Sequence, residues 1–262
     1  GSVLYALLGV NRIQRRACVL RGARTCTPRK RQTSLEALSR DFEDANRHLL
    51  PLVRLVDSVT DEPAEGGNRL TPLFDGAQAF PAMLEAIGGA RRSIALASYI
   101  FNDGPEGRRF VEVLGQAVAR GVQVRVLVDD IGARYSWPSI LPLLQREGIP
   151  SARFLPAHLP LHFPYFNLRN HRKILVVDGS LGFTGGMNIQ EDETRDLHFR
   201  IEGPAVAHLQ RVFAEDWEFT TEEVLQGETW FPEIPSRGCA VARGIANGPN
   251  DARHASRLSV LG

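Results

Sequence analysis

Apolar and polar residues follow one another along the chain in blocks that predict helices and strands in turn. Apolar positions spaced by about 3.6 residues indicate helices, and short apolar runs between turn residues indicate buried strands. From Leu70 onward these blocks alternate, which predicts an α/β fold with a mixed, mostly parallel sheet and helices on both faces. The expected helices are 77–89, 107–120, 137–147 and 204–219, and the expected strands are 93–101, 123–131, 152–155, 173–177, 196–201 and 239–243.

The pattern is weaker on either side of this alternating region. Thr33 or Ser34 can cap a helix whose apolar positions continue to Leu52, and residues 60–68, rich in proline, glycine and acid, indicate a linker. The end of the chain resembles the opening of the main region, where a glycine-containing loop leads into a helix. We therefore expect four parts: residues 1–32, a helix and linker at 33–69, the main unit at 70–236, and the start of a second unit at 237–262.

The first part differs from the rest in charge. Ten largely apolar residues are followed, between Asn11 and Gln32, by eight cationic residues and no acidic one. A membrane-spanning helix needs about 20 apolar residues, so this stretch is either the cytoplasmic end of a longer membrane helix or a solvated basic tail. The remainder of the chain is net acidic, which makes nucleic acid an unlikely partner.

Basic residues in this chain are almost all arginines. Lysine occurs only at Lys30 and Lys173, and the second of these lies in the stretch NHRKILVVDGS. The cysteines Cys18, Cys26 and Cys239 match no metal-site spacing and are expected to be free thiols in a reducing compartment. A lysine retained in an arginine-rich chain suggests a chemical requirement at position 173.

His171 and Lys173 are spaced for a shared task. Residues i and i+2 of an extended strand point to the same face, so an imidazole and an ammonium are expected side by side. A histidine can act as nucleophile or general base, and an ammonium can hold a phosphate oxygen. Asp178 is an odd number of residues away from His171, which directs it to the opposite face and favours a role in anchoring the turn at Asp178 and Gly179.

A short glycine-containing segment follows this stretch. Gly185 and Gly186 allow the backbone to approach a ligand closely, and Asn188 can supply a hydrogen-bond donor. The chain has neither a metal-ligand cluster nor a phosphate-binding loop motif, so no metal and no cofactor are expected.

The six motif positions His171, Lys173, Asp178, Gly185, Gly186 and Asn188 together resemble the signature of the phospholipase D superfamily. The surrounding sequence, from SYIFNDGPEG to DLHFRIEGPAVAHLQRVFAEDW, is similar to the first half of bacterial cardiolipin synthases of the phospholipase D type. This resemblance implies one repeat unit of a phospholipase D-like αβα sandwich. It also implies phosphatidyl transfer between two phosphatidylglycerol molecules through a phosphohistidine intermediate, with glycerol released.

The resemblance assigns roles by position. His171 is implied to be the nucleophile or its acid/base partner, Lys173 and Asn188 to bind phosphate with Gly185 and Gly186, and Asp178 to complete the catalytic set. It further implies a bacterial inner membrane location, with the catalytic unit on the cytoplasmic side and anionic lipid as a partner.

The family uses two such motifs, and this chain contains one. The leading interpretation is therefore a phosphatidyltransferase that needs a second motif-bearing half or a homodimer partner. Two alternatives are a single-motif phosphodiesterase or nuclease that is active as a homodimer, and an inactive module that binds anionic lipid through its arginine cluster.

Other polar residues near the motif are expected to have supporting roles. His198, on a predicted strand, is expected to be a structural hydrogen-bonding residue rather than a catalyst. His158 and His162 are expected to lie in a loop, with a place in the lining of a substrate pocket as the alternative. Asp129 and Asp130 end a strand, and because carboxylates would repel phosphate there, we expect them to anchor a turn and a loop.

Overall fold

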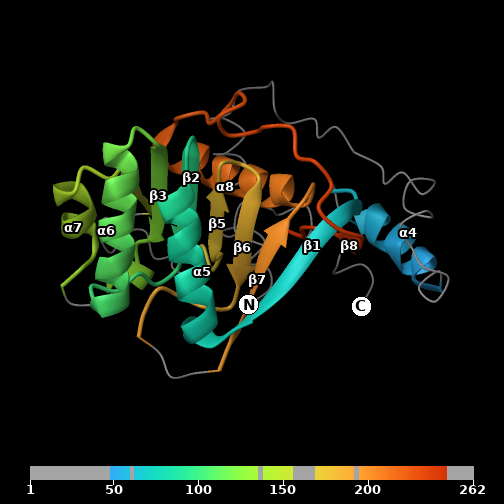
Figure 1. The fold of residues 1–262 in the computed structure, drawn as a ribbon, viewed down its shortest axis with the longest axis horizontal. Helices are drawn as coiled ribbons and strands as arrows, with labels where there is room; N and C mark the ends of the chain where they lie inside the picture. Colours follow the sequence, from blue (N-terminus) through green and yellow to red (C-terminus); the bar gives the residue numbers. More distant parts are fainter. Residues whose placement is uncertain (1–47, 60–61, 135–137, 156–168, 192–194, 247–262) are drawn as a thin grey trace, which may run out of the picture.

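The backbone forms a mixed sheet with helices on both faces (Figure 1). The computed structural model describes residues 48–59, 62–134, 138–155, 169–191 and 195–246. The strands are β1 Glu65–Phe74, β2 Ser93–Ser98, β3 Gln123–Asp129, β4 Ser151–Phe154, β5 Ile174–Val177, β6 Leu181–Gly185, β7 Leu197–Glu202 and β8 Ala240–Ala242. They form an 8-stranded sheet in the order β4-β3-β2-β5-β6-β7-β1-β8.

The helices divide between the two faces of this sheet. Figure 1 shows α5 and α6 in front of the strands and α8 behind them, with α7 beside α6. Strand β2 is buried along its whole length, since Ile94 and Leu96 face the core under α5 and α6, whereas Ala95 and Ala97 face the core under α8. The described helices are α4 Leu50–Val59, α5 Asp75–Gly89, α6 Pro105–Ala119, α7 Leu141–Arg146 and α8 Val206–Thr221, with a 3₁₀ turn at Gly132–Arg134.

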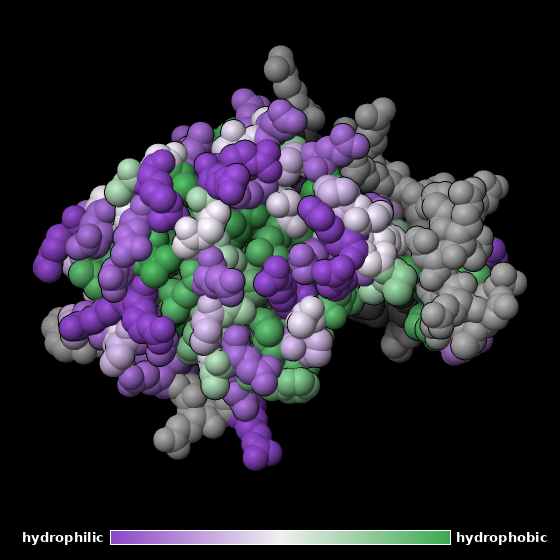
Figure 2. Space-filling model, in the orientation of Figure 1, coloured by the Kyte–Doolittle hydropathy of each residue, from purple (hydrophilic) through white to green (hydrophobic). Residues whose placement is uncertain are grey.

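The outer surface of the helical layer is polar. In Figure 2, the face that carries α5, α6 and α7 is mainly hydrophilic, and hydrophobic atoms appear between the helices. Within the described ranges, no helix has both the length and the apolar character needed to cross a bilayer.

The pairing of the strands corrects one prediction. Pairing is parallel between β2 and β3 and between β3 and β4, whereas the other five pairings between named strands are antiparallel. The mixed sheet with helices on both faces is confirmed, but the expectation of a mostly parallel sheet is wrong. The physical reason is the length of the connections: α6 and α7 provide crossovers in the first half, whereas β5 and β6 are joined by a tight turn, which only antiparallel neighbours can use.

The sequence pattern missed β1 and β6. The expected linker at 60–68 overlaps the start of β1, whose residues pair with β7 and β8. Strand β8, expected to open a second unit, extends this same sheet at its edge. Most of the helix expected from Thr33 or Ser34 falls in residues 1–47, which are outside the described ranges. Residues 247–262 of the expected second unit are also outside them.

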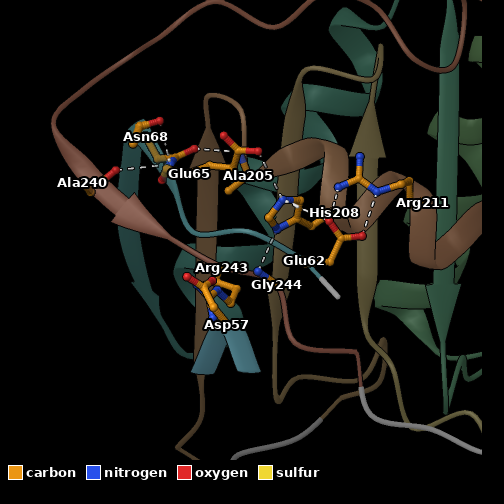
Figure 3. A network of polar contacts seen from close by, with 11 residues as sticks. Asp57, Glu62, Glu65, Asn68, Ala205, His208, Arg211, Ala240, Arg243 and Gly244 are labelled. Atoms are coloured by element: carbon orange, nitrogen blue, oxygen red, sulfur yellow. Dashed lines mark hydrogen bonds and ion pairs between the residues drawn. The ribbon is translucent and has the colours of Figure 1, made fainter. Parts of the chain in front are cut away.

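A buried histidine on α8 holds the β1–β8 end of the molecule together (Figure 3). His208 Nδ1 accepts a hydrogen bond from the N–H of Gly244 at 2.9 Å. Its Nε2 lies 3.5 Å from a carboxylate oxygen of Glu62 and 3.9 Å from one of Glu65. Glu62 also accepts a hydrogen bond from Arg211 at 2.9 Å, so this carboxylate next to His208 is itself held in place.

Two further contacts attach neighbouring segments to the same edge of the sheet. Arg243, just after β8, forms an ion pair with Asp57 of α4. Asn68 of β1 donates to the carbonyl oxygen of Ala240 at 3.2 Å and accepts from the N–H of Ala205 at 2.8 Å. Helix α4 and strand β8 are therefore joined to the sheet by polar contacts.

Candidate functional site

His171 and Lys173 lie in the segment that leads into β5, not in the strand itself. The β5 ladder begins at Ile174, which pairs with Ala97 and Thr184 on its two sides. The carbonyl oxygen of Lys173 accepts a hydrogen bond from the hydroxyl of Thr184 at 2.9 Å, which fixes the segment just before the strand. The predicted strand therefore began one residue too early.

Tyr99, which follows β2, brings the imidazole and the ammonium together. Its ring stacks on His171 with centroids 3.9 Å apart and planes inclined by 19°. The Lys173 ammonium lies 5.6 Å from the centroid of the same ring and donates to the carbonyl oxygen of His171 at 3.0 Å. His171 is exposed, so its ring is accessible to a substrate. Sequence reasoning missed Tyr99, for which the only signal was an aromatic residue at the end of a buried strand.

Two buried carboxylates hold the segment that carries His171. The Asn170 N–H donates to Asp129 at 3.0 Å, and the Asn170 side-chain amide donates to Asp216 at 2.8 Å. The guanidinium of Arg172 forms an ion pair with the same carboxylate of Asp216. The residues on both sides of His171 are thus anchored to β3 and to α8.

The carboxylates after β3 have the anchoring role that the sequence predicted. Asp129 accepts hydrogen bonds from the N–H groups of Ile131 at 3.0 Å and Gly132 at 3.2 Å, in addition to Asn170. Burial raises the pKa of Asp129, which these backbone bonds partly oppose. Asp130 forms an ion pair with Arg134 at 2.9 Å.

The two motif glycines are required by close packing within the protein. Gly185 pairs with His198 in the β6–β7 register, and a Cβ at Gly185 would lie 2.7 Å from His198 Nδ1. A Cβ at Gly186 would lie 2.2 Å from a carboxylate oxygen of Asp196. The sequence predicted close approach to a ligand at these glycines, whereas the structure shows close approach by Asp196 and His198.

Asn188 lies in the loop that follows these glycines. Its side-chain oxygen accepts a hydrogen bond from the N–H of Ile100 at 3.1 Å. Because the oxygen is occupied, the amide nitrogen is the group left to donate to a ligand. The donor role expected of Asn188 therefore stays a prediction.

The pKa values of Lys173 and His198 are shifted from those of exposed side chains. Burial lowers the pKa of Lys173, and the carboxylate of Asp196 opposes that change. Burial also lowers the pKa of His198 from 6.5 to about 4, with Asp196 raising it and Lys173 lowering it further. At neutral pH the His198 imidazole is therefore neutral, and Lys173 and Asp196 act on it with opposite signs.

His198 does not have the role that the sequence predicted. Neither of its ring nitrogens has a hydrogen-bond partner in the part of the chain that the structure describes. The expectation of a structural hydrogen-bonding histidine is therefore wrong. The backbone groups of its strand neighbours are engaged in the β6–β7 and β1–β7 ladders, so they do not serve the ring.

Asp178 lies at the far end of β5, separated from His171 by the whole strand. Its φ of 51° places it in the left-handed region, in a turn with Gly179. Its carboxylate accepts hydrogen bonds from the N–H groups of Arg91, Arg92 and Ser93 at 2.7–3.2 Å. The predicted turn anchor is confirmed, and this position gives Asp178 no contact with the other residues of the catalytic set.

The remaining candidates add nothing to the described site. His158 and His162 lie outside the described residues. In the described ranges, no group of three or more histidine, cysteine and acidic side chains is placed to hold a metal ion.

A family model and the curated relatives identify one family. Residues 83–217 match the family model described as cardiolipin synthase, PLD-like domain. Cardiolipin synthase A of Pseudomonas aeruginosa is 34% identical over 85% of this chain and 46% of its own length, and a cardiolipin synthase of Geobacillus thermodenitrificans is 30% identical over 95% and 52%. The chain thus spans about half the length of these relatives. Among solved structures, the phospholipase D family member Nuc from Salmonella typhimurium aligns with 58% of this chain and 96% of its own, at 20% identity and a TM-score of 0.47.

Proposed function

Since the chain belongs to the family of cardiolipin synthase PLD-like domains, we propose that it takes part in phosphatidyl transfer between phospholipids. The proposed substrates are two phosphatidylglycerol molecules, which give cardiolipin and free glycerol. The observation that carries the proposal is the group formed by His171, Lys173 and Tyr99, in which an exposed imidazole stacks on an aromatic ring beside a lysine ammonium.

The proposed chemistry assigns each group one task. A ring nitrogen of His171 attacks the phosphorus of the first lipid and forms a P–N bond, while the bond from phosphorus to the glycerol oxygen breaks. The departing oxygen takes a proton from a second histidine. The hydroxyl of the second lipid then attacks phosphorus, gives its proton to that second histidine and releases His171. Lys173 and the amide of Asn188 stabilise the charge on the phosphate oxygens.

The second histidine has to come from outside the one motif of this sequence. Lysine occurs only at positions 30 and 173, so no other histidine here is followed by lysine at the motif spacing. The relatives extend over about twice the length that the chain matches. We therefore propose that a second motif-bearing half or a second copy of this chain completes the site. The cationic residues between Asn11 and Gln32 support a further proposal, that the chain works at the cytoplasmic face of a bacterial inner membrane rich in anionic lipid.

The test is turnover of phosphatidylglycerol vesicles by the protein that carries this chain, followed as cardiolipin formation and glycerol release. We expect His171→Ala to lower the rate by about 10³-fold or more, because the nucleophile is lost. Lys173→Arg should also be strongly impaired, since a planar guanidinium does not replace a compact ammonium. Lys30→Arg is the matched control and should keep its activity.

Two outcomes would overturn the proposal. Unchanged cardiolipin formation by His171→Ala would remove the histidine from the reaction. Hydrolysis of nucleic acid or of a soluble phosphodiester, without glycerol release from phosphatidylglycerol, would favour a single-motif phosphodiesterase.

A further inference from the structure

His198 is a buried polar group without a partner, next to a proposed phosphate-binding residue. Its side chain is 1% exposed, and neither Nδ1 nor Nε2 makes a hydrogen bond within the described residues. Buried polar atoms left unpaired destabilise a fold, and most are satisfied in native structures. Such a group inside a reaction site indicates a partner that is gained during function.

The surroundings of the ring define what that partner can be. A neutral imidazole has one N–H donor and one nitrogen that accepts. The strand register places Lys173 and His198 on the two sides of Gly185, because Ile174 pairs with Thr184 and Gly185 pairs with His198. Asp196 and Lys173 also act on the ring electrostatically, one as an acceptor and the other as a donor. The ring lies over the backbone of Gly185, since a Cβ there would lie 2.7 Å from His198 Nδ1.

Lys173 has hydrogen-bonding capacity left for this contact. An ammonium carries three N–H donors, and one of them is directed at the carbonyl oxygen of His171 at 3.0 Å. One further donor can reach a phosphate oxygen, and the last is available for an acceptor of the protein. A carboxylate in that place would neutralise the ammonium, whereas a neutral imidazole nitrogen would leave its full charge for the phosphate.

We propose that His198 is a positioning residue that links Asp196 to Lys173, donating its N–H to the carboxylate and accepting a hydrogen bond from the ammonium when phosphate is bound. The proposal rests on the proposed function, since it assumes that Lys173 holds the phosphate. Through this link, the carboxylate sets the tautomer of the ring and the ring directs the ammonium toward the ligand. His198 acts through Lys173 and does not touch the reacting atoms.

The scarcity of lysine makes the link measurable without turnover. Within residues 1–262, Lys30→Arg leaves Lys173 as the only lysine, so its ¹⁵N-labelled ammonium signal is assigned by its loss in Lys173→Arg and then titrated by NMR. In the presence of saturating phosphate, we expect His198→Leu to lower the pKa of Lys173, because the charged form loses an acceptor. We also expect it to weaken binding of inorganic phosphate by about tenfold, which corresponds to one charge-assisted hydrogen bond. His198→Gln, whose amide oxygen can accept, should restore most of both values.

Stability separates this role from a structural one. Replacing an unpaired buried imidazole by leucine removes the unpaired atoms, so His198→Leu should raise the melting temperature by about 2–4 °C. A ring that held the fold together would give a lower melting temperature on the same change. An unchanged Lys173 pKa and unchanged phosphate affinity in His198→Leu would overturn the link.

The outcome is also distinct from failure of the proposed function. His171→Ala removes the imidazole but keeps the carbonyl oxygen that Lys173 contacts, so the response of Lys173 to His198→Leu should persist in that background. If that response is present while phosphatidyl transfer is absent, the link stands and the proposed reaction fails. If transfer occurs and the response is absent, the reaction stands and the link fails.

Discussion

Two buried histidines of this protein have opposite surroundings. His198 is 1% exposed and His208 is 2% exposed. The ring of His208 accepts a hydrogen bond from the Gly244 N–H at 2.9 Å and faces Glu62 at 3.5 Å, as Figure 3 shows. The ring of His198 makes no hydrogen bond in the described part of the chain, although Lys173 and Asp196 lie close enough to act on it.

The difference shows that burial alone does not identify the role of a histidine. At the β1–β8 end of the sheet, the His208 ring accepts one hydrogen bond through Nδ1, and its Nε2, which makes no hydrogen bond among the described residues, faces the Glu62 carboxylate at 3.5 Å, so its contacts stabilise the fold. At the His171 end, a polar side chain is buried without partners, so the fold is less stable than an apolar core would make it. A loss of stability at His198 is expected of a residue whose polar atoms gain partners when a substrate binds.

The largest expected consequence of this difference is a loss of stability in acid that comes from His198. Its pKa is lowered from 6.5 in the unfolded chain to about 4 in the fold, so the unfolded state binds a proton that the folded state does not take up. Stability should therefore fall as the pH drops from about 6.5 to about 4, by about 3 kcal/mol in total. Urea unfolding at pH 7.5 and pH 4 measures this loss.

The His198→Leu variant provides the control for that experiment. His198→Leu has no imidazole to protonate at this site, so its loss of stability between the two pH values should be smaller than that of the unaltered protein by about the same 3 kcal/mol. An equal acid loss in His198→Leu and in the unaltered protein would show that the pKa of His198 is not lowered by the fold.

The sequence predicted the structure best where a single requirement, such as burial of a strand on both faces, decided which residues could occur. Continuous apolar runs predicted the buried strands β2, β3 and β5, and the spacing of His171 and Lys173 predicted that these two residues meet, as they do at Tyr99. Strand β1 was missed because its central residues are exposed on both faces, so neither alternation nor an apolar run marks it. The state of His198 depends on residues that are distant in sequence, and no local pattern contains that information.

A smaller effect, of opposite sign at the two sites, is expected from the same substitution at neutral pH. His208→Leu removes the acceptor of the Gly244 N–H and leaves that group unpaired, which should lower the free energy of unfolding by about 2 kcal/mol. His198→Leu should raise it. Denaturant unfolding of both variants at pH 7.5 gives the comparison, with His208→Gln as a variant that keeps an acceptor. Destabilisation of similar size by both leucine variants would mean that the two histidines do the same work.

The smallest expected effect concerns the ion pair between Arg243 and Asp57, which attaches α4 to the well-partnered end of the molecule. The side chain of Arg243 is 8% exposed and that of Asp57 is 22% exposed, so solvent screens the pair only in part. Arg243→Gln should cost about 1 kcal/mol and increase amide hydrogen exchange in α4, because that helix loses an attachment, while exchange in β5 and β6 stays unchanged. A double-mutant cycle with Asp57→Asn isolates the pair from the other contacts of each residue. If amide hydrogen exchange rises in β5 and β6 as well, the two ends of the sheet are coupled. The unpaired state of His198 would then depend on the contacts around His208.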